Sequence, residues 1–95
     1  MKKKIALIGY GVIGKRVADA ITLQEDMELA GVCDVISDWR IQAAVSKGYT
    51  IYAATPEAKI NMEQVNIFPA GNMTDLLDVA DLVVDCTPKK IVKHI

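Results

Sequence analysis

The chain has few of the residues from which metal sites and disulfides are built. Its 95 residues include two cysteines, Cys33 and Cys86, and a single histidine, His94. The two cysteines stand far apart in the sequence, in no spacing typical of metal ligands, and the histidine is next to the last residue. We therefore expect no metal site.

The chain also lacks a strong charge of one sign and a long hydrophobic run. Its formal net charge is −1, which gives no reason to expect nucleic acid or an anionic membrane as partner. No stretch approaches the roughly 20 apolar residues of a membrane span. The basic and then apolar start resembles a secretory signal, but Gly9 and Gly11 interrupt it and Lys15-Arg16 follows. A cytoplasmic location is expected.

Apolar runs and helical patterns alternate along the chain, separated by turn residues. Short apolar runs predict parallel strands, and apolar residues at helical spacing predict helices between them. The expected strands are 4–8, 27–34, 49–54 and 81–88. The expected helices are 12–23, a second with Ser37 as its N-cap and Gly48 as its C-terminal stop, 57–64, and 75–79 with Thr74 as its cap. This order predicts an α/β fold in one domain over residues 1–95. It would be a partial, Rossmann-like doubly wound parallel sheet of about four strands, in the order 3-2-1-4, with helices on both faces.

The glycines of GYGVIG, residues 9 to 14, join the first strand to the first helix. A GxGxxG pattern alone is a weak signal, but here a strand precedes it, a helix follows, and an acidic residue stands about 20 positions on. Gly9 would permit the tight turn, Gly11 would let backbone approach a diphosphate, and Gly14 would let helix and strand pack closely. The amides of Val12 and Ile13, at the positive end of the helix dipole, would face the anion. The alternative is a glycine-rich turn without a ligand.

Asp34, at the end of the second predicted strand, bears on the choice of cofactor. Its carboxylate could accept hydrogen bonds from the adenosine ribose hydroxyls and would repel the extra phosphate of NADP. The alternative role is that of a turn or cap residue. The residues directly after Asp34, Val35 and Ile36, offer no guanidinium for a 2′-phosphate, and Arg40 is the only nearby candidate. The sequence therefore favours NAD over NADP. Lys15 and Arg16 lie in the first turn of the helix, where their side chains either contact the bound phosphate or are exposed to water.

The remaining cysteine and aromatic residues predict no chemistry of their own. In the order 3-2-1-4, one strand separates the strands that end near Cys33 and Cys86, so about 9–10 Å separates the cysteines and both are expected to be free thiols. Aromatic side chains could form a platform for bases, but a place in the core or on the surface is the simpler interpretation, with Trp39 packed against the side of its helix. The aromatic residues concerned are Tyr10, Trp39, Tyr49 and Tyr52.

Longer stretches of the sequence resemble the start of the archaeal-type phosphorylating glyceraldehyde-3-phosphate dehydrogenases. The similar runs, in matching order, are GYGVIGKRVADAI, GVCDV, RIQAAVSKGYTIYAA and DVADLVVDCTP. The resemblance implies a tetrameric oxidoreductase with an N-terminal nucleotide-binding domain, in which Val12 and Ile13 grip the cofactor phosphates. It also implies that Cys86, Thr87 and Pro88 lie on the nicotinamide side of the cleft.

The sequence departs from the family in two ways. Family members often carry a basic residue where Asp34 stands, which puts NADP use in doubt. Their catalytic cysteine lies in a Ser-Cys-Asn-Thr-type motif beyond these 95 residues, so no residue here is predicted to be catalytic. We expect a cofactor-binding segment that does not catalyse the reaction alone. One alternative is a stand-alone nucleotide-binding or oligomerisation module without chemistry. The other is a structural remnant that binds nothing. Because the last strand would form an exposed apolar edge, a homo-oligomer is expected.

Overall fold

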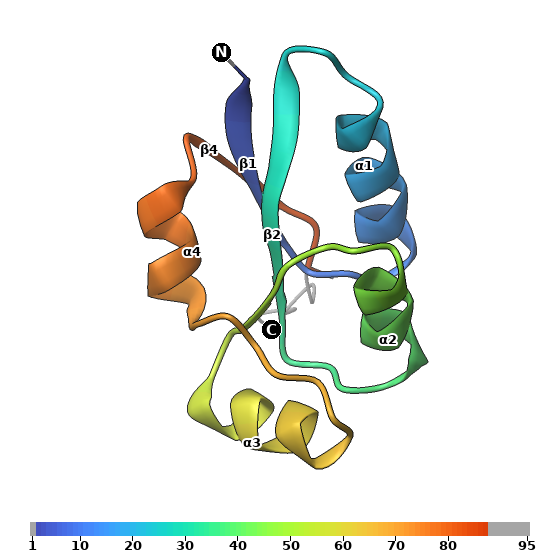
Figure 1. The fold of residues 1–95 in the computed structure, drawn as a ribbon, viewed down its shortest axis with the longest axis vertical. Helices are drawn as coiled ribbons and strands as arrows, with labels where there is room; N and C mark the ends of the chain where they lie inside the picture. Colours follow the sequence, from blue (N-terminus) through green and yellow to red (C-terminus); the bar gives the residue numbers. More distant parts are fainter. Residues whose placement is uncertain (1, 88–95) are drawn as a thin grey trace, which may run out of the picture.

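The computed structural model describes residues 2–87, which form one four-stranded parallel sheet flanked by helices (Figure 1). The strands lie in the order β3-β2-β1-β4, which confirms the topology predicted from the sequence. The strands are β1 (Lys3–Ile8), β2 (Met27–Asp34), β3 (Ile51–Ala53) and β4 (Leu82–Asp85). The expected strand boundaries at 49–54 and 81–88 were too wide, because pairing of β3 and β4 covers only their central residues. The tail from residue 88, including Pro88 and His94, lies outside the described residues.

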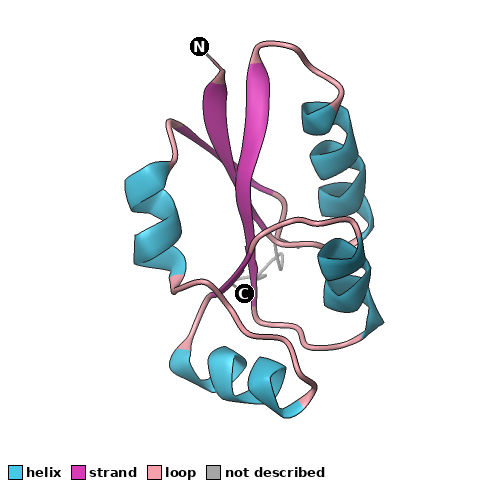
Figure 2. Ribbon diagram, viewed as in Figure 1, coloured by secondary structure: helices cyan, strands magenta, loops and turns pink. Residues whose placement is uncertain are grey.

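Helices cover both faces of the sheet, as expected (Figure 2). Helices α1 (Val12–Thr22) and α2 (Trp39–Ser46) lie on one face, and α4 (Met73–Val79) lies on the other, while α3 (Pro56–Gln64) packs beside β3. Successive residues of a strand point to opposite faces. Leu7 and Val32 therefore join a large core cluster with residues of α1, α2 and α3. Their neighbours Ala6 and Cys33 join a smaller cluster with Leu76 of α4.

The carboxyl ends of β1 and β2 meet at the glycine turn. Ile8 is in register with Cys33 on one side and with Asp85 on the other. The amide of Gly9 donates to the Cys33 carbonyl at 2.8 Å, and the amide of Cys86 donates to the Ile8 carbonyl at 2.7 Å. The turn is thus held between the ends of β2 and β4.

Two predicted helix caps are wrong. Asp38, not Ser37, caps α2, since its side chain accepts from the Arg40 amide. Asn72, not Thr74, caps α4 and forms a capping box with Asp75, so this helix begins before Thr74. In both cases the cap is the residue whose side chain the backbone path brings to the free amides of the first turn. The predicted stop at Gly48 is confirmed, because this residue has φ +83° just after α2.

Candidate functional site

Gly9 is fixed as glycine by its own backbone and by its surroundings. Its φ of +92° lies in the region that side chains disfavour. A Cβ built at Gly9 would lie 2.9 Å from the Thr87 backbone nitrogen. The tight turn predicted from the sequence is therefore present at this position.

Gly14 is fixed by close packing between α1 and the turn. A Cβ there would lie 2.1 Å from the carbonyl oxygen of Gly9 and 3.6 Å from the Cβ of Cys86. Only glycine lets the helix approach the end of β1 so closely. This agrees with the helix–strand packing role expected for the third glycine.

Gly11 is different, because nothing within the described chain requires a glycine there. Its φ of −86° and ψ of −155° are extended values that any residue adopts, and a Cβ at this position would meet no atom within 4 Å. The space in front of Gly11 is open, and backbone there is accessible to a molecule from outside the chain.

The N-terminus of α1 begins at this open position. Gly11 is the N-cap, and no side chain caps the helix, whereas Asp38, Thr55 and Asn72 cap the other three helices of residues 2–87. The first amides of a helix have no partner inside it and lie at the positive end of its dipole. In α1 these amides belong to Val12, Ile13 and Gly14, so an anion at Gly11 would meet free donors.

Asp34 lies at the end of β2, next to the glycine turn. Its Oδ2 accepts a hydrogen bond from the Tyr10 amide at 2.5 Å, and its Oδ1 accepts from the Val35 amide at 2.7 Å and the Ile36 amide at 3.4 Å. The turn role considered as an alternative in the sequence is thus observed. The contact with Tyr10 had no signal in the sequence, since the two residues are 24 positions apart and one partner is backbone.

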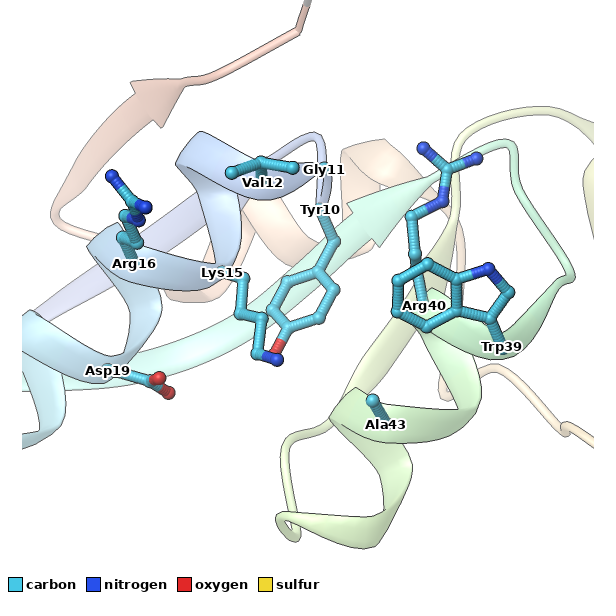
Figure 3. Close-up of a pocket in the computed structure, with 9 residues that line it drawn as sticks. All are labelled: Tyr10, Gly11, Val12, Lys15, Arg16, Asp19, Trp39, Arg40 and Ala43. Atoms are coloured by element: carbon cyan, nitrogen blue, oxygen red, sulfur yellow. The ribbon is translucent and has the colours of Figure 1, made fainter.

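A cavity of about 290 Å³ lies beside the turn, between α1 and α2 (Figure 3). Tyr10 forms part of its wall, while Lys15 and Asp19 approach from α1 and Trp39 and Arg40 from α2. The cavity is lined by Tyr10, Gly11, Val12, Lys15, Arg16, Asp19, Trp39, Arg40 and Ala43. Three of these side chains are cations and one is an anion, so the cavity favours negative charge next to the open glycine.

The aromatic residues of this region differ from one another in exposure. Tyr10 is 1% exposed and makes an edge-to-face contact with Tyr49, with ring centroids 6.4 Å apart. Its hydroxyl is buried and has no hydrogen-bond partner among the described residues. Trp39 is 69% exposed, so the expectation that it packs along its helix is wrong. Its indole lines the cavity from the α2 side (Figure 3).

The charged groups around the cavity are partly paired. Arg40 binds Asp38 through Nη2 at 2.8 Å, and Asp19 accepts from Lys47 at 2.8 Å and from the Tyr49 hydroxyl at 2.9 Å. The hydrogen bonds from Lys47 and Tyr49 lower the pKa of the Asp19 carboxyl. Asp19 thus remains ionised and is already engaged by groups outside the cavity.

A second cavity, of about 530 Å³, lies at the N-termini of α3 and α4. Three of its polar side chains bind backbone amides of the protein: Thr55 accepts from the Ala58 amide, and Asn72 and Asp75 form the capping box. The helix ends here already have acceptors. Of the two cavities, the one beside Gly11 is therefore the better candidate for an anionic ligand.

The cysteines near the site are free and poorly ionised. Burial, with a smaller effect of the Asp34 charge, raises the pKa of the Cys33 thiol to about 11. Burial, and then the Asp85 charge, raises the pKa of the Cys86 thiol as well. A nucleophilic cysteine needs the opposite shift, so neither thiol has the environment of a catalytic one.

The turn after β4 brings Thr87 next to Gly9 of the glycine turn. Asp85 Oδ1 accepts from the Thr87 amide at 2.9 Å and from its hydroxyl at 2.6 Å. Pro88, the other residue expected on the nicotinamide side, lies outside the described residues. Within residues 2–87 no group of three or more potential metal ligands is found. The described helices are all too short or too polar to cross a membrane.

Comparison with known proteins identifies relatives of this stretch. The chain is 47% identical over 89 residues to glyceraldehyde-3-phosphate dehydrogenase of Methanothermus fervidus, which covers 94% of the chain and 26% of that enzyme. It is 49% identical over 85 residues to the enzyme of Methanococcus vannielii, and the match covers 90% of the chain and 25% of that enzyme. The chain is homologous to the N-terminal quarter of archaeal glyceraldehyde-3-phosphate dehydrogenases.

The likeness to these dehydrogenases extends along nearly all of the chain. The enzyme of Archaeoglobus fulgidus matches over 91 residues at 47% identity, covering 96% of the chain and 26% of the enzyme. No family model matches the chain. Among solved structures, an NAD-binding protein from Listeria innocua aligns with a TM-score of 0.47 and 18% identity, over 90% of this chain and 35% of that one. The chain spans about a quarter of the length of the dehydrogenases it matches.

Proposed function

We propose that this chain binds a dinucleotide at the glycine turn and supplies the cofactor-binding part of a glyceraldehyde-3-phosphate dehydrogenase. The amides of Val12, Ile13 and Gly14 would hold the diphosphate, and Asp34 would accept from the adenosine ribose. Thr87 and Pro88 would border the nicotinamide side. Homology to the N-terminal quarter of these dehydrogenases supports the proposal.

One observation carries the binding proposal. Gly11 is a glycine although neither its dihedral angles nor its neighbours require one. The open space before it adjoins a helix N-terminus without a side-chain cap and a cavity with three cations. A diphosphate that approaches the backbone would account for all three features.

We further propose that NAD is preferred over NADP. The Asp34 carboxylate lies beside the turn, where it would repel a 2′-phosphate. Arg40, the guanidinium that could bind that phosphate, is paired with Asp38. The three cations around the cavity would attract a 2′-phosphate, so the preference for NAD requires the bound ribose to lie closer to Asp34 than to these cations.

The binding proposal is tested by titrating the chain with NAD, NADP and AMP while following amide chemical shifts. We expect saturable shifts at Gly11 to Gly14, with a lower Kd for NAD than for NADP. Gly48, also a glycine beside a helix end but with φ +83° at a C-terminus, is the internal control and should not shift. Absence of shifts at millimolar ligand would refute binding, and a lower Kd for NADP would refute the preference alone.

We propose that these residues do not perform hydride transfer or acyl chemistry by themselves. Cys33 and Cys86 both have raised pKa values, and neither lies in the motif that carries the catalytic cysteine of the family. A purified sample that oxidised glyceraldehyde-3-phosphate with NAD and phosphate would contradict this. A non-catalytic nucleotide-binding or oligomerisation module shares the same turn and remains the second candidate.

We also propose that the chain forms a homo-oligomer through the free edge of β4. Leu82 and Val83 are each 51% exposed, and within residues 2–87 only β1 pairs with β4. An apolar strand with an unpaired edge favours pairing with another copy. A cytoplasmic location stays a prediction from the sequence.

A further inference from the structure

The charge of Asp34 raises a problem for an anion site. A carboxylate beside the amides that bind phosphate should repel the ligand and weaken binding. Asp34 lies close enough to the turn for its Oδ2 to accept from the Tyr10 amide at 2.5 Å. If ribose recognition were its only role, the diphosphate part of a ligand would bind better without it.

The hydrogen bonds of Asp34 point to a second role. The Gly9 amide donates to the Cys33 carbonyl at 2.8 Å, and the next amide along the turn, that of Tyr10, donates to the Asp34 side chain. Two successive residues of the turn are thus tied to two successive residues of β2. The amide that follows belongs to Gly11, the open position at the start of α1.

The carboxylate itself is held in place by its own strand end. Its Oδ1 accepts from the Val35 amide at 2.7 Å and the Ile36 amide at 3.4 Å, which leaves Oδ2 directed at Tyr10. Tyr10 is in turn anchored by its ring, which is 1% exposed in the large core cluster. Both ends of the contact are therefore fixed, and the hydrogen bond is one of the stronger kind, to an ionised acceptor.

We infer that Asp34 is a positioning residue for the phosphate-binding turn, and that it acts on diphosphate affinity through Tyr10 rather than by touching the diphosphate. The inference rests on the proposed function. Its carboxylate holds the turn in the conformation that presents the amides of α1 before any ligand arrives. The gain from this pre-ordering exceeds the repulsion between the carboxylate and the bound anion.

The sign of one substitution separates the two roles. In Asp34→Asn the side chain has a single acceptor oxygen, and its amide group faces a backbone donor, so at least one of the three hydrogen bonds is lost. A positioning role predicts a Kd for inorganic diphosphate about tenfold higher than in the wild type. A ribose-only role predicts an unchanged or lower Kd for diphosphate, because a negative charge has been removed.

Asp38→Asn is the matched control. It makes the same change of charge and shape four residues further on, and asparagine keeps an acceptor for the α2 cap. Asp38 has no hydrogen bond to the turn within residues 2–87. Its substitution removes the same charge and also frees Arg40, which lines the cavity, so diphosphate affinity should stay equal or rise. A Kd raised equally in both variants would overturn the inference.

Hydrogen exchange in the wild-type chain tests the contact without any variant. The Tyr10 amide should exchange at least about tenfold more slowly than the Gly11 amide next to it, and in Asp34→Asn this difference should shrink. Equal exchange of the two amides in the wild type would overturn the inference even if Asp34→Asn failed to fold. A wild-type chain that bound neither diphosphate nor AMP would instead refute the proposed function, and the exchange result would still stand.

Discussion

The first side-chain carbon of any residue at Gly14 would lie 2.1 Å from the carbonyl oxygen of Gly9. A carbon atom and a carbonyl oxygen cannot come so close without a bond between them, so the helix or the turn would have to move. Gly14→Ala should therefore destabilise the fold by about 3 kcal/mol or more, at the upper end of overpacking effects. Gly11→Ala is the matched control, because its Cβ meets no atom within 4 Å, and it should cost no more than about 1 kcal/mol. Urea denaturation of both variants measures the difference, and equal losses would contradict the packing argument.

Gly11→Ser should separate stability from ligand binding. Serine is a good N-cap, so this variant should be as stable as the wild type or more stable by a few tenths of a kcal/mol. Its side chain would fill the open space and accept from the same first-turn amides that a diphosphate needs. We expect the Kd for AMP to rise at least about tenfold, measured by isothermal titration. An unchanged Kd would show that the ligand, if bound, does not approach Gly11.

Cys33 should be nearly unreactive in the folded chain. With a pKa of about 11, only about one thiol in ten thousand is ionised at pH 7, and the side chain is fully buried. Iodoacetamide at pH 7 should therefore modify Cys86, which is partly exposed, before Cys33. Denaturation in urea should remove the difference. Preferential labelling of Cys33 in native buffer would contradict its burial.

The ion pair between Asp19 and Lys47 should make stability depend on acid pH. The pKa of Asp19 is lowered in the folded state, so its contribution is present above the ordinary value of 3.8 and is lost as the pH falls through the folded value. Both side chains are more than a third exposed, so the effect is small. Thermal denaturation between pH 2 and 6 should show less acid dependence in Asp19→Asn than in the wild type. An identical pH profile for Asp19→Asn would contradict the prediction.

A charge on the free edge of β4 should oppose self-association. Val83 is half exposed on this strand, and Val83→Lys would place a cation where a second copy would pair. Sedimentation equilibrium should show a wild-type assembly that dissociates in Val83→Lys. Ile60→Lys, an exposed apolar residue on α3, serves as control and should leave the assembly intact. A wild-type monomer at high concentration would rule out the homo-oligomer.

The strand order and two glycine roles could be predicted because each depends on local sequence. Alternation of apolar runs with helical patterns determines a parallel sheet, and the sharp turn at Gly9 and the close packing at Gly14 follow from where the glycines stand. The two helix caps were assigned wrongly because Ser37 and Asp38, and likewise Asn72 and Thr74, are residue types with similar N-cap preference that stand close together in the sequence. Only the backbone path decides which side chain reaches the free amides.

The contacts of Asp34 and Trp39 could not be predicted, for a different reason. The partner of Asp34 is the backbone of Tyr10, which has no sequence signature, and the pairing depends on how β1 and β2 end relative to each other. Trp39 follows an aspartate that begins α2, so its side chain lies at the helix start and not along the buried stripe of Ile41 and Ala44. Hydrophobicity alone assigns such a residue to the core.

The two sides of the sheet bury unequal amounts of apolar surface. Among residues 2–87, the fully buried members of the cluster under α4 are Ala6, Cys33 and Leu76, whereas the opposite cluster includes residues of three helices. Leu76 is the buried residue of α4, so we expect this helix to detach at a lower free-energy cost than global unfolding. Such a partly open molecule would keep the glycine turn docked between α1 and β2. It would also expose the Cys33 thiol, so the slow rate of alkylation of that sulfur would report the local opening of α4 rather than global unfolding.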